Sequence, residues 1–231
     1  MNGKLYCIGV GPGDPELLTL KAVRLIRSCP ALALPAADPQ KCVAYQIILK
    51  VLPEAAQKQL LPLDLPMKED PGLLREKHLT AARAVAEVIH AGKDVAFLTL
   101  GDPTLYCTFS YLQPLLSAMG ITMEYVSGVS SFCAAAARLK VPLVRGREAL
   151  HVIPALSGAV PADSSGAQVL LKAGKNMEAV KALMKQSTGS VFVVENCGLE
   201  NGHIYRSADE LPEKTGYLTL VLKLPENREG L

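Results

Sequence analysis

Apolar residues along the first part of the chain alternate between two arrangements. Short continuous runs at 5–10 and 94–100 have the length and composition of strands that are covered on both faces. Apolar positions at helical spacing follow these runs, at 17–26 and 104–119, and another helix is expected at 73–91 before Gly92. Because strands that alternate with helices pair in parallel through right-handed crossovers, this pattern predicts a parallel α/β sheet.

Beyond Gly120 the expected strands outnumber the helices, which predicts a second α/β domain with a mixed sheet. We therefore expect an N-terminal domain over 1–119 and a C-terminal domain over 120–231, with 142–148 as a competing hinge. A stretch rich in Pro, Ser, Gly and Asp at 159–166 predicts a solvent-exposed loop. In this second part, strands are expected at 122–126, 150–156, 168–171, 191–195 and 218–224, and helices at 130–139 and 177–185.

Charge and hydropathy exclude several classes of partner. The chain has 24 Lys and Arg against 22 Asp and Glu, a net charge of only +2, without a basic run that contains aromatic residues. A nucleic-acid partner is therefore not expected. No apolar run approaches the roughly 18 residues of a membrane span, and the first ten residues do not resemble a signal peptide. We expect a cytoplasmic protein with no membrane partner.

Cysteine and histidine spacing gives no support to a metal site. No pair of cysteines has C-x-x-C spacing, and the four histidines lack H-x-x-x-H spacing. Since free cysteine behaves as a small apolar residue in a reducing compartment, the cysteines are expected to be reduced and mostly buried. They are Cys7, Cys29, Cys42, Cys107, Cys133 and Cys197.

A glycine-rich loop at 9–16, with the sequence GVGPGDPE, joins the first strand to the first helix. Asp14 is placed to cap that helix and Pro15 to occupy its first position. The glycines make a tight turn in the simplest interpretation, or they let the backbone approach a ligand at the carboxyl ends of the strands. Asp14 occupies the third glycine position of a dinucleotide fingerprint, and no Walker A lysine follows.

Two further loops follow expected strands. In the first, at 98–106, Asp102 is expected to cap the next helix and Pro103 to begin it, while the backbone at Gly101 stays accessible. In the second, at 127–133, Ser130 or Ser131 caps a helix, or the free N–H groups of that helix start bind a carboxylate. A hydrolase is disfavoured because no G-x-S-x-G motif is present.

Taken in order, three motifs resemble those of the tetrapyrrole (corrin/porphyrin) methylase family. They are GVGPGD at 9–14, LGDP at 100–103 and SGVSS at 127–131. The resemblance continues to the last expected strand through LLKAG, VENC and the segment from Tyr217 to Lys223. The stretch around 96–112 and the insert at 66–70 are most similar to the branch that methylates C20 of precorrin-2 or cobalt-factor II in cobalamin biosynthesis.

The resemblance implies a two-domain enzyme, commonly a homodimer, with S-adenosylmethionine in a cleft between the domains and an anionic tetrapyrrole in an adjacent trough. Asp102 and Tyr106 are the candidates for removing a proton from the tetrapyrrole ring. The better fit for Asp102 is to cap the next helix and to orient the loop before it. Carried over by motif, the cofactor-binding residues are Pro12, Leu100, Gly101, Asp102, Leu105, Tyr106, Ser130, Ser131, Phe132, Leu171 and Lys172. Relatives commonly have an apolar residue near position 172, so Lys172 departs from the pattern.

Substrate binding and function leave alternatives open. Lys140, Arg145 and Arg147 lie within eight residues and are either clamps for substrate carboxylates or a solvated basic loop. The alternatives in function are another regiospecific methylase of the same family, an NAD-dependent dehydrogenase, and a cofactor-binding module without catalysis. Asp14 disfavours the dehydrogenase.

Overall fold

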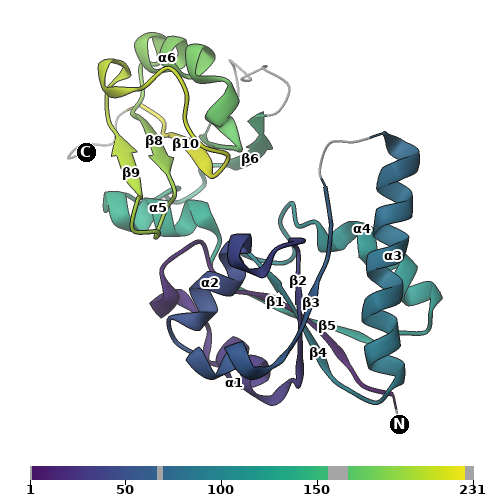
Figure 1. Ribbon diagram of the computed structural model, residues 1–231. Helices are drawn as coiled ribbons and strands as arrows, with labels where there is room; N and C mark the ends of the chain where they lie inside the picture. Colours follow the sequence, from purple (N-terminus) through teal and green to yellow (C-terminus); the bar gives the residue numbers. More distant parts are fainter. Residues whose placement is uncertain (1, 67–69, 156–165, 227–231) are drawn as a thin grey trace. The chain divides into compact units, whose positions relative to one another are not determined.

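The computed structural model describes residues 2–66, 70–155 and 166–226. The chain divides after Ser130 into two compact units (Figure 1). Both units are α/β, one with a parallel sheet and one with a mixed sheet, so the expected fold class is confirmed. Much of the loop expected at 159–166 and the middle of the insert at 66–70 lie outside the described residues.

The first unit is built on a five-stranded sheet in the order β3-β2-β4-β1-β5, with every neighbouring pair parallel. The three interior strands, β2, β4 and β1, are buried at every position, as expected for strands covered on both faces. The carboxyl ends of β4, β1 and β5 are therefore adjacent. The strands are β1 (Leu5–Gly9), β2 (Ala31–Leu34), β3 (Gln59–Pro62), β4 (Val95–Thr99) and β5 (Met123–Val126).

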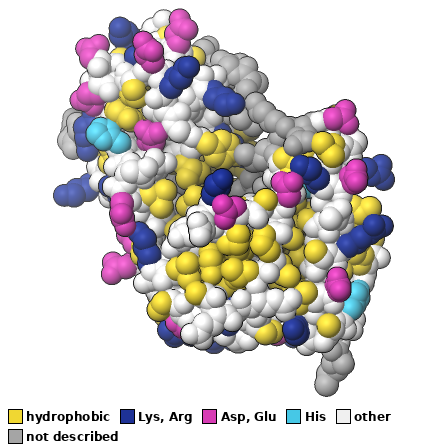
Figure 2. All heavy atoms as spheres, viewed as in Figure 1, with side chains coloured by type: hydrophobic (Ala, Val, Ile, Leu, Met, Phe, Trp, Pro, Cys, Tyr) yellow, Lys and Arg dark blue, Asp and Glu magenta, His cyan; other side chains and the backbone are white. Residues whose placement is uncertain are grey.

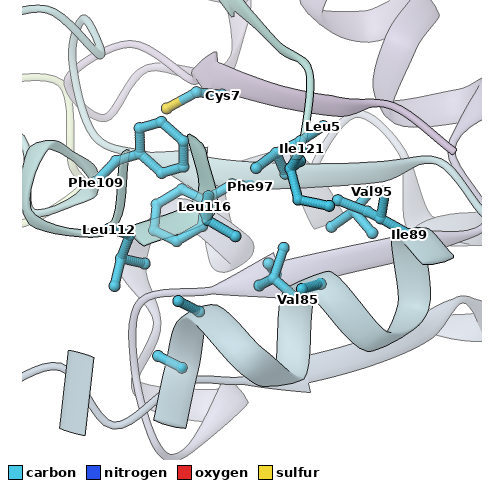
Figure 3. Packing of buried hydrophobic residues seen from close by; sticks show 14 of the residues in the cluster. Leu5, Cys7, Val85, Ile89, Val95, Phe97, Phe109, Leu112, Leu116 and Ile121 are labelled. Carbon is cyan, nitrogen blue, oxygen red and sulfur yellow. The ribbon is translucent and has the colours of Figure 1, made fainter. Parts of the chain in front are cut away.

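The described residues of this unit form four α-helices, and two of them pack on one face of the sheet. Figure 3 shows the core on that face, where side chains of β1 and β4 meet those of the helices. The ring centroids of Phe97 and Phe109 lie 4.9 Å apart, and both side chains are fully buried. The helices are α1 (Leu20–Ser28), α2 (Val43–Leu49), α3 (Pro71–His90) and α4 (Phe109–Ala118), of which α3 and α4 form this face.

The second unit holds the mixed sheet, in the order β6-β7-β10-β8-β9. β6 and β7 pair in parallel, and the other three pairs are antiparallel. Its elements are α5 (Ser131–Leu139), β6 (Leu150–Pro154), β7 (Ala167–Leu171), α6 (Met177–Gln186), β8 (Val191–Glu195), β9 (His203–Tyr205) and β10 (Thr219–Lys223).

Three features of the fold differ from the sequence-based expectations. The division falls after Ser130 rather than after Met119, because β5 pairs with β1 and completes the first sheet. The helix expected at 104–119 begins only at Phe109, because Tyr106 has a φ of +48°, which a right-handed helix does not accommodate. The sequence pattern also missed β2, α2, β3 and β9, all of which are seven residues long or shorter.

The cysteines are reduced and mostly buried, as expected from the sequence, and charges of both signs lie on the surface (Figure 2). All six cysteines are free thiols, and five are buried, whereas Cys133 is exposed. Figure 2 shows cationic and anionic side chains interspersed on the face in view. No helix in the described part of the chain has both the length and the apolar character needed to cross a membrane. Within the same residues, no group of three His, Cys, Asp or Glu side chains is arranged to hold a metal ion.

Candidate functional site at the strand ends of the first unit

The loops after β1 and β4 are joined by backbone hydrogen bonds. The amide of Gly101 donates to the carbonyl of Gly11 at 2.8 Å, and the amide of Gly11 donates back to Gly101 at 3.3 Å. One step earlier, the amide of Val10 donates to the carbonyl of Thr99 at 2.9 Å. The two motifs at 9–14 and 100–103 are therefore held side by side at the carboxyl edge of the sheet, where open α/β sheets bind ligands.

Backbone crowding at this edge explains the glycines. A Cβ on Gly128 would lie 2.2 Å from the carbonyl oxygen of Gly101 and 2.8 Å from the carbonyl carbon of Gly9. A Cβ on Gly9 would lie 2.5 Å from the same Gly101 oxygen. Real Cβ atoms do not approach backbone this closely, so the loops after β1, β4 and β5 meet only because glycine occupies these positions.

Gly101 itself has open space on its other side. It has a φ of +66°, in the left-handed region that favours glycine, and a Cβ there would meet only the carbonyl oxygen of Val129 at 4.0 Å. A ligand can therefore approach the backbone at Gly101 where it cannot approach at Gly9 or Gly128.

Asp102 links two of these loops through its two carboxylate oxygens. One oxygen accepts from the amide of Thr104 at 2.8 Å and from the Thr104 hydroxyl. The other accepts from the amide of Gly128 at 3.1 Å, on the loop after β5. The expectation that Asp102 caps the next helix is wrong, because it closes a short turn and α4 begins with Thr108 at its cap position.

Hydrogen bonding keeps Asp102 ionised. Partial burial is the largest single influence on its pKa and would raise it, but the opposing hydrogen bonds prevail. Those from the side chain and amide of Thr104 contribute most, followed by the Gly128 amide and the Ser127 side chain, and the pKa lies below its usual range. Asp102 is thus a charged side chain whose acceptor oxygens are already engaged.

The other expected residues of this unit lie on or beside the same loops. Pro12 is buried, and the expected role of Asp14 is confirmed in part, since it accepts from the amide of Glu16 at 2.9 Å. The element that Asp14 caps is a short 3-10 helix at Pro15–Leu17, and α1 begins only after the Thr19 cap. Leu100 directly follows β4. Leu105 and Tyr106 lie in the turn before α4 and are 39% and 48% exposed.

The remaining expected residues lie at the boundary between the units or within the second unit. Ser130 ends the first unit, Ser131 begins α5 and Phe132 is buried. Leu171 ends β7, and Lys172 follows in a left-handed conformation with φ +60°. The ammonium of Lys172 lies 5.3 Å from the centre of the Tyr217 ring. Whether these residues approach the loops of the first unit stays a prediction.

Sequence reasoning missed two residues beside the site. Thr99 is buried at the end of β4, and its hydroxyl lies 3.1 Å from the sulfur of Cys107, which is also buried. Cys107 also accepts from the amide of Phe109 at 3.4 Å. The only sequence signal is a threonine at the end of an otherwise apolar strand run, which does not identify its partner.

Two solved structures with a similar fold are methyltransferases. One is a cobalt precorrin-4 methyltransferase of cobalamin biosynthesis, with a TM-score of 0.71, 23% identity and coverage of 95% of this chain and 94% of that chain. Another is the uroporphyrin-III C-methyltransferase of Thermus thermophilus complexed with S-adenosylhomocysteine, with a TM-score of 0.64, 20% identity and coverage of 95% and 97%. At these identities the likeness shows the fold alone, an α/β fold of two units.

Residues 4–212 match the model of the Tetrapyrrole (Corrin/Porphyrin) Methylases, and the chain belongs to this family. It is 39% identical to a probable cobalt-precorrin-2 C(20)-methyltransferase of Methanocaldococcus jannaschii, over 65% of this chain and 64% of that protein. It is 35% identical to the cobalt-precorrin-2 C(20)-methyltransferase of Salmonella typhimurium, over 81% and 80%. It is also 31% identical to the cobalamin biosynthesis protein CobIJ of Mycobacterium tuberculosis, over 98% of this chain and 47% of that protein.

Proposed function

We propose that this chain transfers the methyl group of S-adenosylmethionine to C20 of precorrin-2 or its cobalt-containing form, in cobalamin biosynthesis. The observation that carries the proposal is the joining of the three family motifs by Gly9, Gly101 and Gly128 at one edge of a parallel sheet. The names of the relatives from Methanocaldococcus and Salmonella support C20 as the position.

The residues at this edge fit a compact organic cofactor. Gly101 leaves open space beside its backbone, and the neighbouring Leu100 and Leu105 are partly exposed apolar side chains. When bound, S-adenosylmethionine would supply an already activated methyl group. Pro12, Leu100, Gly101 and Leu105 would hold it, together with residues from Ser130 to Phe132, and Leu171 or Lys172 would approach from the second unit.

Positioning is the main contribution that these residues can make to catalysis. Because the donor is activated and the ring carbon is itself electron-rich, alignment of the reacting atoms accounts for the largest share of the rate, by analogy with effective molarities worth about 7 to 11 kcal/mol. We propose that Asp102 acts in this way. Its lowered pKa makes it a poor proton acceptor, and its two oxygens hold the loops after β4 and β5 together.

Tyr106 is expected to position the substrate or cofactor rather than remove a proton. Loss of a general base would lower kcat roughly 10²- to 10⁴-fold. Because we assign Tyr106 a positioning role instead, we expect Tyr106→Phe to lower kcat by less than about tenfold. The matched control is Tyr111→Phe on α4, where the side chain is 63% exposed. Steady-state kinetics with the tetrapyrrole would measure both, and a loss beyond a hundredfold at Tyr106 alone would identify it as the base.

Arg147 is the proposed clamp for a substrate carboxylate. It is exposed in a loop whose turn is closed by the Arg145 amide donating to Glu148 at 2.8 Å. Arg147→Glu should raise the KM for the tetrapyrrole about tenfold through charge repulsion and leave the KM for S-adenosylmethionine unchanged. Arg75→Glu on α3 makes the same charge change elsewhere and should alter neither KM. Equal values for both variants would leave a solvated basic loop as the correct interpretation.

The decisive experiment is incubation with S-adenosylmethionine labelled in its methyl group and with precorrin-2, metal-free and with cobalt. Carbon NMR of the product should show the label at C20. A label at another ring carbon would identify a different regiospecific methylase, and bound cofactor without turnover would identify a binding module. Calorimetry with S-adenosylhomocysteine against NADH would exclude the dehydrogenase. Homodimer formation and a cytoplasmic location remain predictions.

A further inference from the structure

Cys7 and Cys107 form a buried thiol cluster with Thr99 directly behind the candidate site. Cys7 on β1 is in register with Phe97 on β4, and Gly9 is in register with Thr99. Because side chains alternate between the faces of a strand, Cys7 and Thr99 point to the same face of the sheet. Cys107 lies over this face, where its sulfur is 3.1 Å from the Thr99 hydroxyl, and Cys7 and Cys107 belong to the same buried cluster.

The two thiols differ strongly in how readily they ionise. The hydrogen bond from Cys7 is the main cause that lowers the pKa of Cys107, to about 6. Burial opposes this shift, while hydrogen bonds from Thr99 and from the amide of Phe109 add to it. Burial raises the pKa of Cys7 far above its usual range, and its hydrogen bond to Cys107 raises it further. Cys107 is therefore the thiol of the pair that ionises more readily.

We propose that Cys107 is a modification site for small peroxides and that it closes a disulfide with Cys7. The Cys107 thiolate attacks a peroxide oxygen, the O–O bond breaks, and a sulfenic acid and hydroxide form. The Cys7 sulfur then attacks the Cys107 sulfur, the S–OH bond breaks, and the Cys7 proton leaves with the hydroxide as water. Hydrogen peroxide is reduced, and the two thiols are oxidised to one disulfide.

Closing this disulfide would change the turn that contacts the cofactor. Cys107 directly follows Leu105 and Tyr106, and its hydrogen bonds to Thr99 and Phe109 hold the end of that turn. A disulfide replaces the thiolate that accepts these bonds. This second part rests on the proposed function and predicts that oxidation lowers the affinity for S-adenosylhomocysteine at least fivefold, with recovery on reduction by dithiothreitol.

Peptide mass spectrometry after mild hydrogen peroxide treatment of the whole chain would test the modification site. We expect a linked pair of peptides containing Cys7 and Cys107. In Cys7→Ser, we expect Cys107 to be trapped as a sulfenic acid by dimedone. Linkage of another pair, or oxidation of the exposed Cys133 with Cys107 unchanged, would overturn the assignment. These results need no substrate, so their failure is distinct from failure of the proposed methyl transfer.

Alkylation by iodoacetamide at neutral pH adds a test that does not require the Cys7 variant to fold. Cys29 is the matched control, since it is a fully buried thiol whose pKa is raised to about 11, chiefly by burial. Cys107, which is 8% exposed, should react at least tenfold faster than Cys29. Thr99→Val removes one hydrogen bond to Cys107 and should slow its reaction selectively. Equal rates at Cys107 and Cys29 would contradict a stabilised thiolate.

The effect on the candidate site has a separate outcome. Calorimetry with S-adenosylhomocysteine on the oxidised protein should give the lower affinity, and the wild-type value should return after reduction. A disulfide that forms with unchanged affinity would overturn the coupling to the site.

Discussion

Gly128→Ala should lower the affinity for S-adenosylhomocysteine by about tenfold to a hundredfold and destabilise the first unit. The added methyl group would lie 2.2 Å from the Gly101 oxygen and within 2.9 Å of two backbone atoms of Gly9. None of these atoms is the end of a flexible side chain, so the three loops must separate. Overpacking of this kind costs about 1–3 kcal/mol, and every 1.4 kcal/mol lost from the bound geometry lowers an affinity about tenfold.

Calorimetry and urea denaturation would measure the two effects of Gly128→Ala. Gly72→Ala is the control, because a Cβ there meets only a carboxylate oxygen of Asp70 at 3.0 Å, in the first turn of α3. It should leave the affinity unchanged. Wild-type affinity in Gly128→Ala would mean that the meeting of the three loops does not shape the cofactor site.

Asp102→Asn should lower the affinity for S-adenosylhomocysteine at least tenfold and the free energy of unfolding by about 1–3 kcal/mol. An amide has only one acceptor oxygen, so it cannot accept from Thr104 on one side and Gly128 on the other. Hydrogen bonds to a charged group contribute about 1.5–3 kcal/mol. Calorimetry and urea denaturation at neutral pH would measure both losses.

The pH dependence of stability shows how much of the contribution of Asp102 comes from its negative charge rather than from the size of its side chain. Because folding lowers its pKa, the ionised carboxylate stabilises the fold above its unfolded pKa of about 4, and this contribution is lost as the pH falls through the folded value. Asp102→Asn should therefore flatten the acid side of the stability profile. Asp38→Asn is the control, since Asp38 accepts from the amide of Gln40 at 2.9 Å in a similar local turn. An equal loss in both variants would refute the link between the loops.

The placement of the three motif loops at strand ends could be predicted from the sequence, because each loop directly follows a strand run. For β1 and β4 these runs are apolar except for Thr99 at the end of β4, and glycine marks each loop. The role of Asp102 could not be predicted in this way. Capping is a local pattern, and the Asp-Pro pair gave no sign that Tyr106 leaves the helical region and delays α4 to Phe109.

The sequence alone determined the α/β class, the strand-loop-helix order of the motifs and the family, because buried strands, glycine turns and caps depend on residues close together in the chain. Only the tertiary structure decided that β5 lies beside β1, that Asp102 holds Gly128, and that Cys7 and Thr99 meet Cys107. Each of these contacts joins residues that are far apart in the sequence and are brought together in space by the strand order β4-β1-β5. Hydrophobic periodicity indicates that a strand exists, but it carries no information about which strand lies next to it.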